Sequence, residues 1–264
     1  MMKHIRTILA KEWTEMRRNK LVFSVVIFVP LLMAAIPIVM LILMGRLPIK
    51  QSDFEELGRM LNNPLYSGMT PAEAMQSVLA SNYLVLFLMM PLMVPVTIAA
   101  YSIVGEKITR SLEPLLATPV STTELLLGKG LAAALPGIIT AWLCYGIFLI
   151  FARIFAVSDR VFRVFTDPMW LVAMFVLAPL LTVMAVNVGI IVSSRTSDPR
   201  AAEQLGSLVI LPLMILFIGP LTGFIMLNST TFWISSLIVA VLDVGLVYLG
   251  VKLFQRETIL TRWK

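Results

Sequence analysis

Six long apolar stretches constrain the fold of this chain more than any other feature. They lie at about residues 21–45, 83–104, 130–152, 169–194, 207–227 and 232–251. Each has roughly the 20 residues that an α-helix needs to cross a bilayer, and none alternates polar and apolar residues as barrel strands do. Because backbone groups in lipid must be satisfied within the segment, we predict six transmembrane helices. The fold class is therefore predicted to be an all-α membrane protein, in line with a hydrophobic content of 59%.

The distribution of basic residues predicts the topology. If the N-terminus is cytoplasmic, the inner segments 1–20, 105–129, 195–206 and 252–264 hold 15 Lys and Arg, and the outer segments 46–82 and 153–168 hold six. The positive-inside rule then places both termini in the cytoplasm. Because topology accounts for the net charge of +6, we expect a lipid membrane and no nucleic acid among the partners.

Residues 1–20 have the pattern of an interfacial amphipathic helix. Apolar residues share one side of this helix and basic residues occupy the rest, which is typical of a helix lying among lipid headgroups. The apolar set is Ile5, Ile8, Leu9, Trp13 and Met16. We expect this helix to lead into the first span.

The outer segment 46–82 is predicted to be a small external helical loop. It contains two capping boxes, Ser52 with Glu55 and Thr70 with Glu73, each of which satisfies free N–H groups at a helix start. Pro71 follows the second cap, in the first helical position, where proline is favoured. The second of these helices is predicted to continue into the second span.

The connection between the second and third spans, residues 105–128, has the chemistry of a defined shape. It lies within the stretch GEKITRSLEPLLATPVSTTELLLGKG. Ser121 and Glu124 form a capping box, which predicts a new helix that continues into the third span. A plain connection needs only about two to eight residues. Two interpretations remain open: a solvated linker on the membrane surface, or a preformed knob that a cytoplasmic partner grips.

The pattern G-E-K-x-x-R-S-L-E-P-L-L-A-T-P-V-S-T-T-E-L-L-L-G-K in this stretch resembles the cytoplasmic coupling segment of ABC-2 type permeases. These permeases are the membrane subunits of ABC exporters, and the resemblance extends to the six spans, the basic leader and the external loop. It implies a single transmembrane domain over residues 1–264, with segment 105–128 receiving the motion of an ATPase. The residues carried over by position are Glu106, Arg110, Leu112, Glu113, Thr118, Pro119, Ser121 and Glu124.

The resemblance also implies partners and a location. The expected partners are an ABC ATPase subunit, which binds ATP and Mg, and a second permease copy or close homologue. The expected cargo is a lipid-like, amphipathic or ionic molecule exported across a prokaryotic plasma membrane.

The residues themselves point to a separate source of energy. The only Gly-Lys pair, Gly128 and Lys129, has Thr123 where a phosphate-binding loop needs glycine and is followed by Gly130 instead of Ser or Thr. We therefore expect a transport subunit without its own ATPase site or cofactor, and not an enzyme. His4 is the sole histidine, and no metal site is predicted.

Asp243 is the only acidic residue within a predicted span. An ionised carboxylate at this depth costs at least about 2.5 kcal/mol unless it is paired, protonated or hydrated. One interpretation is a proton or cation site, which would make the chain an ion-coupled secondary transporter. The other is a structural carboxyl that is protonated or hydrogen-bonded to a neighbouring helix, with Asn187 in the fourth span as the candidate partner.

Overall fold

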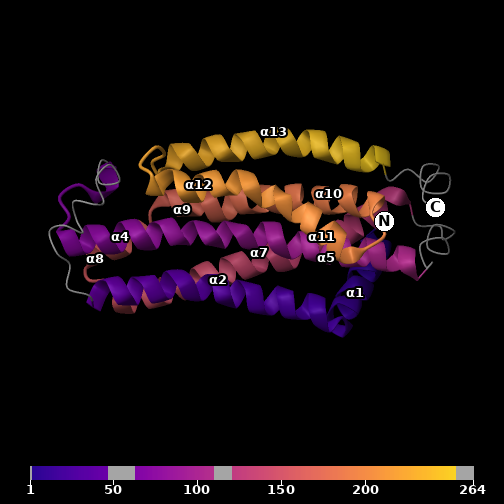
Figure 1. The fold of residues 1–264 in the computed structure, drawn as a ribbon, viewed down its shortest axis with the longest axis horizontal. Helices are drawn as coiled ribbons and strands as arrows, with labels where there is room; N and C mark the ends of the chain where they lie inside the picture. The colour runs from indigo at the N-terminus through magenta and orange to yellow at the C-terminus, as the bar shows by residue number, and fades with distance from the viewer. Residues whose placement is uncertain (1, 47–62, 110–120, 254–264) are drawn as a thin grey trace.

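The computed structural model describes residues 2–46, 63–109 and 121–253, and in these ranges it contains helices and no strand (Figure 1). Six helical stretches are long and apolar enough to cross a membrane, which confirms the predicted all-α, six-span fold. They are Lys20–Arg46, Pro71–Ile108, Glu124–Phe155, Asp159–Arg195, Pro199–Leu221 and Ser229–Gly250.

Several of these stretches consist of consecutive shorter helices. The first half of the chain forms α1 (Met2–Arg18), α2 (Lys20–Arg46), η2 (Pro64–Tyr66), α4 (Pro71–Leu84), η3 (Val85–Met89), α5 (Met90–Ile108) and α7 (Thr122–Phe155). The second half forms α8 (Asp159–Phe165), α9 (Pro168–Val172), η4 (Ala173–Leu177), α10 (Ala178–Arg195), α11 (Pro199–Ser207), η5 (Leu208–Ile210), α12 (Leu211–Leu221) and α13 (Ser229–Leu253).

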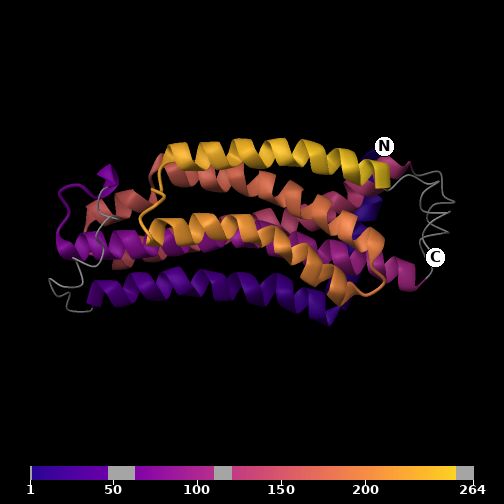
Figure 2. The same ribbon diagram turned by 45° about the horizontal axis from the view of Figure 1, so that its top comes forward.

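The helices form an elongated bundle with the second span in its interior. Of the residues in the apolar stretch of Pro71–Ile108, 83% are buried, compared with 28% for α2 and 22% for Ser229–Gly250. In both views α2 and α13 form opposite edges of the bundle, while α5 lies between other helices (Figures 1 and 2). The second span is therefore the most buried of the six described spans.

The two ends of the bundle are distinguished by the segments that lie there. The helix α1, the end of α5, the start of α7 and the end of α13 lie at one end, and α8 with the start of α4 lies at the other (Figure 1). We call the α1 end the inner end, because the positive-inside distribution predicts it to be cytoplasmic. There α1 crosses the bundle steeply relative to the spans.

The described capping box of the external loop forms as predicted. Thr70 accepts a hydrogen bond from the N–H of Glu73, and the Glu73 carboxylate accepts one from the N–H of Thr70. Helix α4 starts at Pro71 and leads through η3 into α5, so its predicted continuation into the second span is confirmed. The other capping box, Ser52 with Glu55, lies outside the described residues.

The fifth span ends earlier than its hydropathy predicts. Helix α12 stops at Leu221, whereas the apolar run continues to Leu227. Pro220 cannot donate to the helix ladder, and Gly223 takes a φ of 70°, a left-handed conformation that favours glycine. Residues 222–227 therefore form the turn between α12 and α13.

At the outer end, the side chain of Gln76 joins three segments. Its amide nitrogen donates to the carbonyl of Leu41 in α2 at 2.7 Å and to that of Phe155, the last residue of α7, at 3.0 Å. Its amide oxygen accepts from the N–H of Val157 at 2.9 Å. Since Gln76 is fully buried, these bonds fasten α4 to α2 and α7 away from water.

Candidate functional site

The structure describes part of the predicted coupling segment. Glu106 lies in the last turn of α5, and Ser121 and Glu124 lie at the start of α7. Both bonds of the Ser121–Glu124 capping box are present, and α7 then runs without a break into the third span, as predicted. Five assigned residues lie outside the described residues: Arg110, Leu112, Glu113, Thr118 and Pro119.

A buried ion pair closes the base of this segment. The amine of Lys129, on α7, lies 2.9 Å from a carboxylate oxygen of Glu106, on α5. Glu106 is 4% exposed and Lys129 is 6% exposed. Thus Glu106 does not face the cytoplasm as part of an open knob, and the two helices that border the segment are bonded to each other just above it.

Helix α1 supplies the remaining charges of this cluster. The Lys129 amine also contacts the carboxylate of Glu12 at 2.7 Å and donates to the hydroxyl of Ser102 at 2.7 Å. The Ser102 hydroxyl donates in turn to Glu12 at 2.6 Å. Lys11 donates to the other oxygen of Glu106 at 2.5 Å. We call Lys11, Glu12, Ser102, Glu106 and Lys129 the inner charged cluster.

The inner charged cluster balances two acids against two lysines. Buried ions cost several kcal/mol each unless opposite charges and hydrogen bonds compensate them, and here each carboxylate meets two or more partners. The contribution of such a cluster to stability is small when it is complete. Its effect is instead to fix the relative positions of the three helices that supply it, α1, α5 and α7.

Further contacts hold α1 along the first turns of α7. Ile8 is buried in an apolar cluster with Leu125, and the indole N–H of Trp13 donates to the carbonyl of Ala132 at 3.1 Å. His4 lies 3.4 Å from the carboxylate of Glu124. The apolar side of α1 therefore packs on α7, which places the start of α1 beside the end of the predicted coupling segment.

On the next residue of α5, Lys107 attaches the fourth span. Its amine donates to the carbonyls of Ser193 at 2.6 Å and Ser194 at 2.8 Å, and to that of Thr196 at 3.1 Å. These carbonyls lie at the C-terminal end of α10. The C-terminal end of a helix has free hydrogen-bond acceptors and a partial negative charge that favours a cation. Glu106 and Lys107 together connect α5 to α1, α7 and α10.

The charges around Lys11 and Glu12 shift both pKa values toward the charged forms. Burial acts against both charges, but it is outweighed in each case. Hydrogen bonding to Glu106 and the nearby carboxylates raise the pKa of Lys11 above its ordinary value. Attraction to Lys129, with hydrogen bonds from Lys129 and Ser102, lowers the pKa of Glu12. Both groups are therefore charged over the neutral range.

These shifts predict a loss of stability in acid that depends on Glu12. A carboxyl whose pKa is lower in the folded state stabilises the fold above its unfolded-state pKa, and this contribution is lost as the pH falls through the folded-state pKa. Lys11 behaves oppositely: its contribution is complete below its unfolded-state pKa and is lost as the pH rises through the folded-state value. We expect Glu12→Gln to lower the melting temperature of the detergent-solubilised protein at neutral pH and to have a smaller effect in acid. A difference that stays constant down to acid pH would contradict this assignment.

Four members of the inner charged cluster were not among the predicted site residues: Lys11, Glu12, Ser102 and Lys129. For Glu12 the sequence does contain a signal. It lies four residues from both Ile8 and Met16, and therefore on the apolar side of the amphipathic helix, where a carboxylate needs a buried partner. Lys129 directly precedes a long apolar run, so its charge also needs a partner. Nothing in the sequence shows that these two residues meet.

The predicted intramembrane polar pair does not form. Asp243 is 6% exposed, and neither of its carboxylate oxygens has a hydrogen-bond partner in the described part of the chain. The amide nitrogen of Asn187 instead donates to the carbonyl of Val183 in its own helix at 2.8 Å, and its oxygen lies near Gly250. The expected Asn187–Asp243 hydrogen bond is wrong, because Asn187 lies about two turns nearer the inner end than Asp243.

The fold is that of a multi-pass, all-α membrane protein. A buried charged cluster lies beside the connection between its second and third spans. Residues 55–242, more than two thirds of the 264, match the model of the ABC-2 family transporter proteins. The chain therefore belongs to the ABC-2 family of transporter proteins, which implies an ABC ATPase as its partner. A comparison with curated proteins finds no significant match. Helix α1, with Lys11 and Glu12, lies outside the matched range.

Proposed function

We propose that the chain is the permease subunit of an ATP-driven exporter and that a separate ATPase subunit moves it through segment 105–128. The observation that carries the proposal is the ion pair between Glu106 and Lys129. Since this pair joins α5 to α7 at the base of the segment, a force on the segment displaces both helices together. An open, solvated linker would have no such base.

The buried contacts supply a path for that displacement into the bundle. Helix α5 is bonded to α1 and α7 through the inner charged cluster and to α10 through Lys107. Helix α5 also contacts α11: the hydroxyl of Thr97 on α5 donates to the carboxylate of Glu203 on α11 at 2.7 Å. A rigid-body motion of packed helices is one of the established forms of conformational coupling. We infer that these helices move as one unit.

The proposal includes the partners that a permease of this kind requires. ATP and Mg bind to the ATPase subunit, and a second permease copy or close homologue completes the translocation path. The cargo is a lipid-like, amphipathic or ionic molecule, and the location is a prokaryotic plasma membrane. Ser121 and Glu124 contribute by shaping the end of the segment through their capping box, while Arg110, Leu112, Glu113, Thr118 and Pro119 complete its docking face.

Site-directed crosslinking tests the docking assignment. Ser121 is exposed at the inner end, and Asp159 is exposed at the outer end. In a Cys144→Ala background, which removes the single cysteine, we expect Ser121→Cys to crosslink to an ABC ATPase subunit in the native membrane. The matched variant Asp159→Cys is expected to form no such crosslink. Failure of Ser121→Cys to capture the ATPase from the native membrane would overturn the assignment.

A second candidate function rests on Asp243. A carboxyl that is buried in a span without a hydrogen-bond partner is suited to bind a proton or a cation, which is the basis for an ion-coupled secondary transporter. Transport measured in proteoliposomes that contain the chain and its ATPase partner separates the two candidates. ATP-dependent transport that persists in Asp243→Asn supports the exporter, whereas transport driven by a proton or sodium gradient without ATP, and abolished in Asp243→Asn, supports the ion-coupled transporter.

A further inference from the structure

The second span changes its helical geometry within the bundle. Between α4 and α5, residues Val85–Met89 form the 3-10 helix η3. The cause lies in the sequence: Pro91 has no N–H to donate to the carbonyl of Phe87, and that carbonyl accepts from the N–H of Met90 instead. Such a stretch inside a long helix often marks a functional hinge.

The fourth span has a similar break at the same place. Residues Ala173–Leu177 form the π-helical segment η4, in which the N–H of Ala178 donates to the carbonyl of Ala173. Pro179 follows, and it has no N–H for the preceding turn. The segments η3 and η4 contact each other. Two neighbouring spans therefore depart from α-helical geometry side by side.

On the inner side of these breaks, neighbouring helices pack closely against α5. A Cβ atom on Gly137 of α7 would lie only 2.8 Å from the ring of Pro95, and one on Gly206 of α11 only 2.6 Å from the side chain of Val96. Real Cβ atoms essentially never approach other atoms this closely. Further inward, the inner charged cluster and Lys107 hold the same helix.

On the outer side, α4 belongs to a different set of contacts. Gln76 bonds it to the outer ends of α2 and α7. Between Gln76 and η3, both polar atoms of the Asn82 side-chain amide are buried without hydrogen-bond partners among the described residues. An unpaired buried polar group costs about 1–3 kcal/mol, so this turn of α4 is the least well satisfied part of the span.

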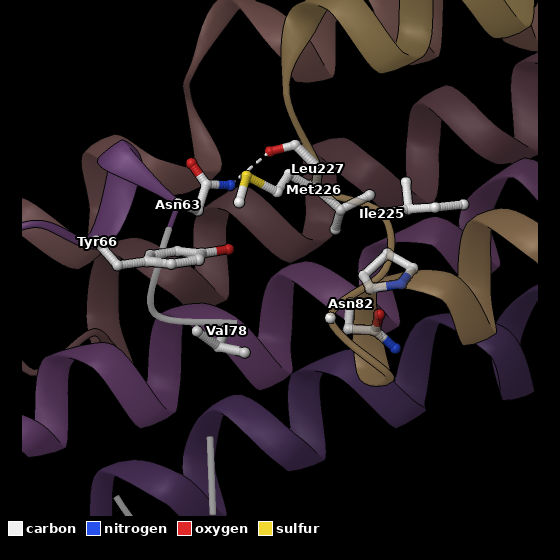
Figure 3. A pocket seen from close by; sticks show the side chains of 9 residues that line it. Asn63, Tyr66, Val78, Asn82, Ile225, Met226 and Leu227 are labelled. Carbon is white, nitrogen blue, oxygen red and sulfur yellow. Dashed lines mark hydrogen bonds between the residues drawn. The ribbon is translucent and has the colours of Figure 1, made fainter. Parts of the chain in front are cut away.

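A small pocket lies next to this turn. Val78 and Asn82 line it from α4, Tyr66 lines it from η2, and the turn at 223–227 lines the opposite side (Figure 3). The amide of Asn63 donates across it to the carbonyl of Leu227 at 2.8 Å. The cavity measures about 20 Å³, room for about one water molecule, so α4 is not packed directly against the turn here.

We propose that η3, set by Pro91 and supported by η4, is a hinge between an inner unit built around α5 and an outer unit built around α4. The inner unit follows the coupling segment, and the bend at η3 converts its displacement into a change of angle at the outer end. The role in transport rests on the proposed function, but the bending itself is a property of the chain alone. Pro91 is thus a positioning residue for the transport cycle.

Distance measurements between two spin labels test the hinge without any ATPase. The labels are placed at Ala72→Cys, near the start of α4, and at Ile108→Cys, at the end of α5, in a Cys144→Ala background in lipid nanodiscs. We expect a broad distance distribution for this protein. Pro91→Ala restores an N–H that can donate to the carbonyl of Phe87 and is expected to narrow the distribution. The control Pro136→Ala, which replaces a proline inside α7, is expected to leave its width unchanged. A narrow distance distribution in the protein that retains Pro91 would overturn the hinge. A broad distribution that Pro91→Ala does not narrow would also overturn it.

Two further measurements separate the hinge from the proposed function. In proteoliposomes with the ATPase, we expect Pro91→Ala to lose most transport and Pro136→Ala to retain it. Full transport by a Pro91→Ala protein with a narrowed distance distribution would overturn the role of the hinge. If neither the parent protein nor any variant transports with ATP, the proposed function fails while the distance result stands. Should Pro91→Ala not fold, amide hydrogen exchange of the parent decides: exchange at 88–90 as slow as at 98–104 would overturn the hinge.

Discussion

Lys129→Met is expected to lower the free energy of unfolding by about 3–5 kcal/mol. The lysine amine contacts Glu12, Glu106 and Ser102 within 2.9 Å, and its loss leaves two carboxylates buried together without it. Removal of one member of a buried ion pair is costly because water cannot replace the lost partner, and Lys11 is then the only cation left in the cluster for two carboxylates. The measurement is thermal or denaturant unfolding of the detergent-solubilised protein, followed by circular dichroism.

An exposed ion pair provides the control for this prediction. Arg153 and Asp159 lie 2.6 Å apart, closer than Lys129 and Glu106, but their side chains are 64% and 76% exposed. Exposed pairs contribute about 0–1 kcal/mol, so Arg153→Met is expected to have a small effect. In addition, Glu106→Gln/Lys129→Met should be less destabilised than the sum of its two single variants, because the partner of the missing lysine is then uncharged. Additive losses would show that the two groups do not interact.

Gln76→Leu is expected to lower the free energy of unfolding by about 2–4 kcal/mol. Leucine has a similar volume but forms no hydrogen bonds, so the N–H of Val157 loses its partner and the carbonyls of Leu41 and Phe155 each lose one. The outer ends of α2, α4 and α7 should then separate more readily. Protease sensitivity of the outer segments, measured with the unfolding transition, reports this separation.

The matched change for this prediction is Gln204→Leu. Gln204 is exposed on α11, where a substitution away from special contacts changes stability by about 0.5 kcal/mol or less. Equal effects of the two substitutions would contradict the assignment of Gln76 as a fastener. Because Gln76 and the inner charged cluster lie at opposite ends of the bundle, their effects are expected to add.

Together these contacts describe an interior helix that is held differently along its length. The inner half of the second span has charged, hydrogen-bonded and close-packed attachments on several sides. The outer half has no ion pair among the described residues and is attached through the hydrogen bonds of Gln76 and the apolar packing of Val78, Ala80 and Leu84. The break at η3 lies between the two regimes. If the protein is driven from its inner end, we expect the inner unit around α5 to move as a rigid body. The second span then bends only at η3, on the outer side of Pro91.

Local signals predicted much of the fold. The six apolar runs, the start of α4 at Thr70–Glu73 and the start of α7 at Ser121–Glu124 all form as predicted, because hydrophobic length and helix capping depend on residues close together in the chain. The predicted end of the fifth span at Leu227 was wrong, because it was taken from hydrophobic length alone. Hydropathy continued there, but Pro220 and Gly223 had already ended the helix.

The sequence alone therefore determined the number of spans, their helical form, the expected topology and the family resemblance, since each depends on composition or on spacing within one segment. Only the tertiary structure decided that Glu12, Glu106 and Lys129 meet and that Asn187 and Asp243 do not. Those residues come from separate helices, and the order of helices in a bundle is set by the packing of whole surfaces. No spacing along the chain records it.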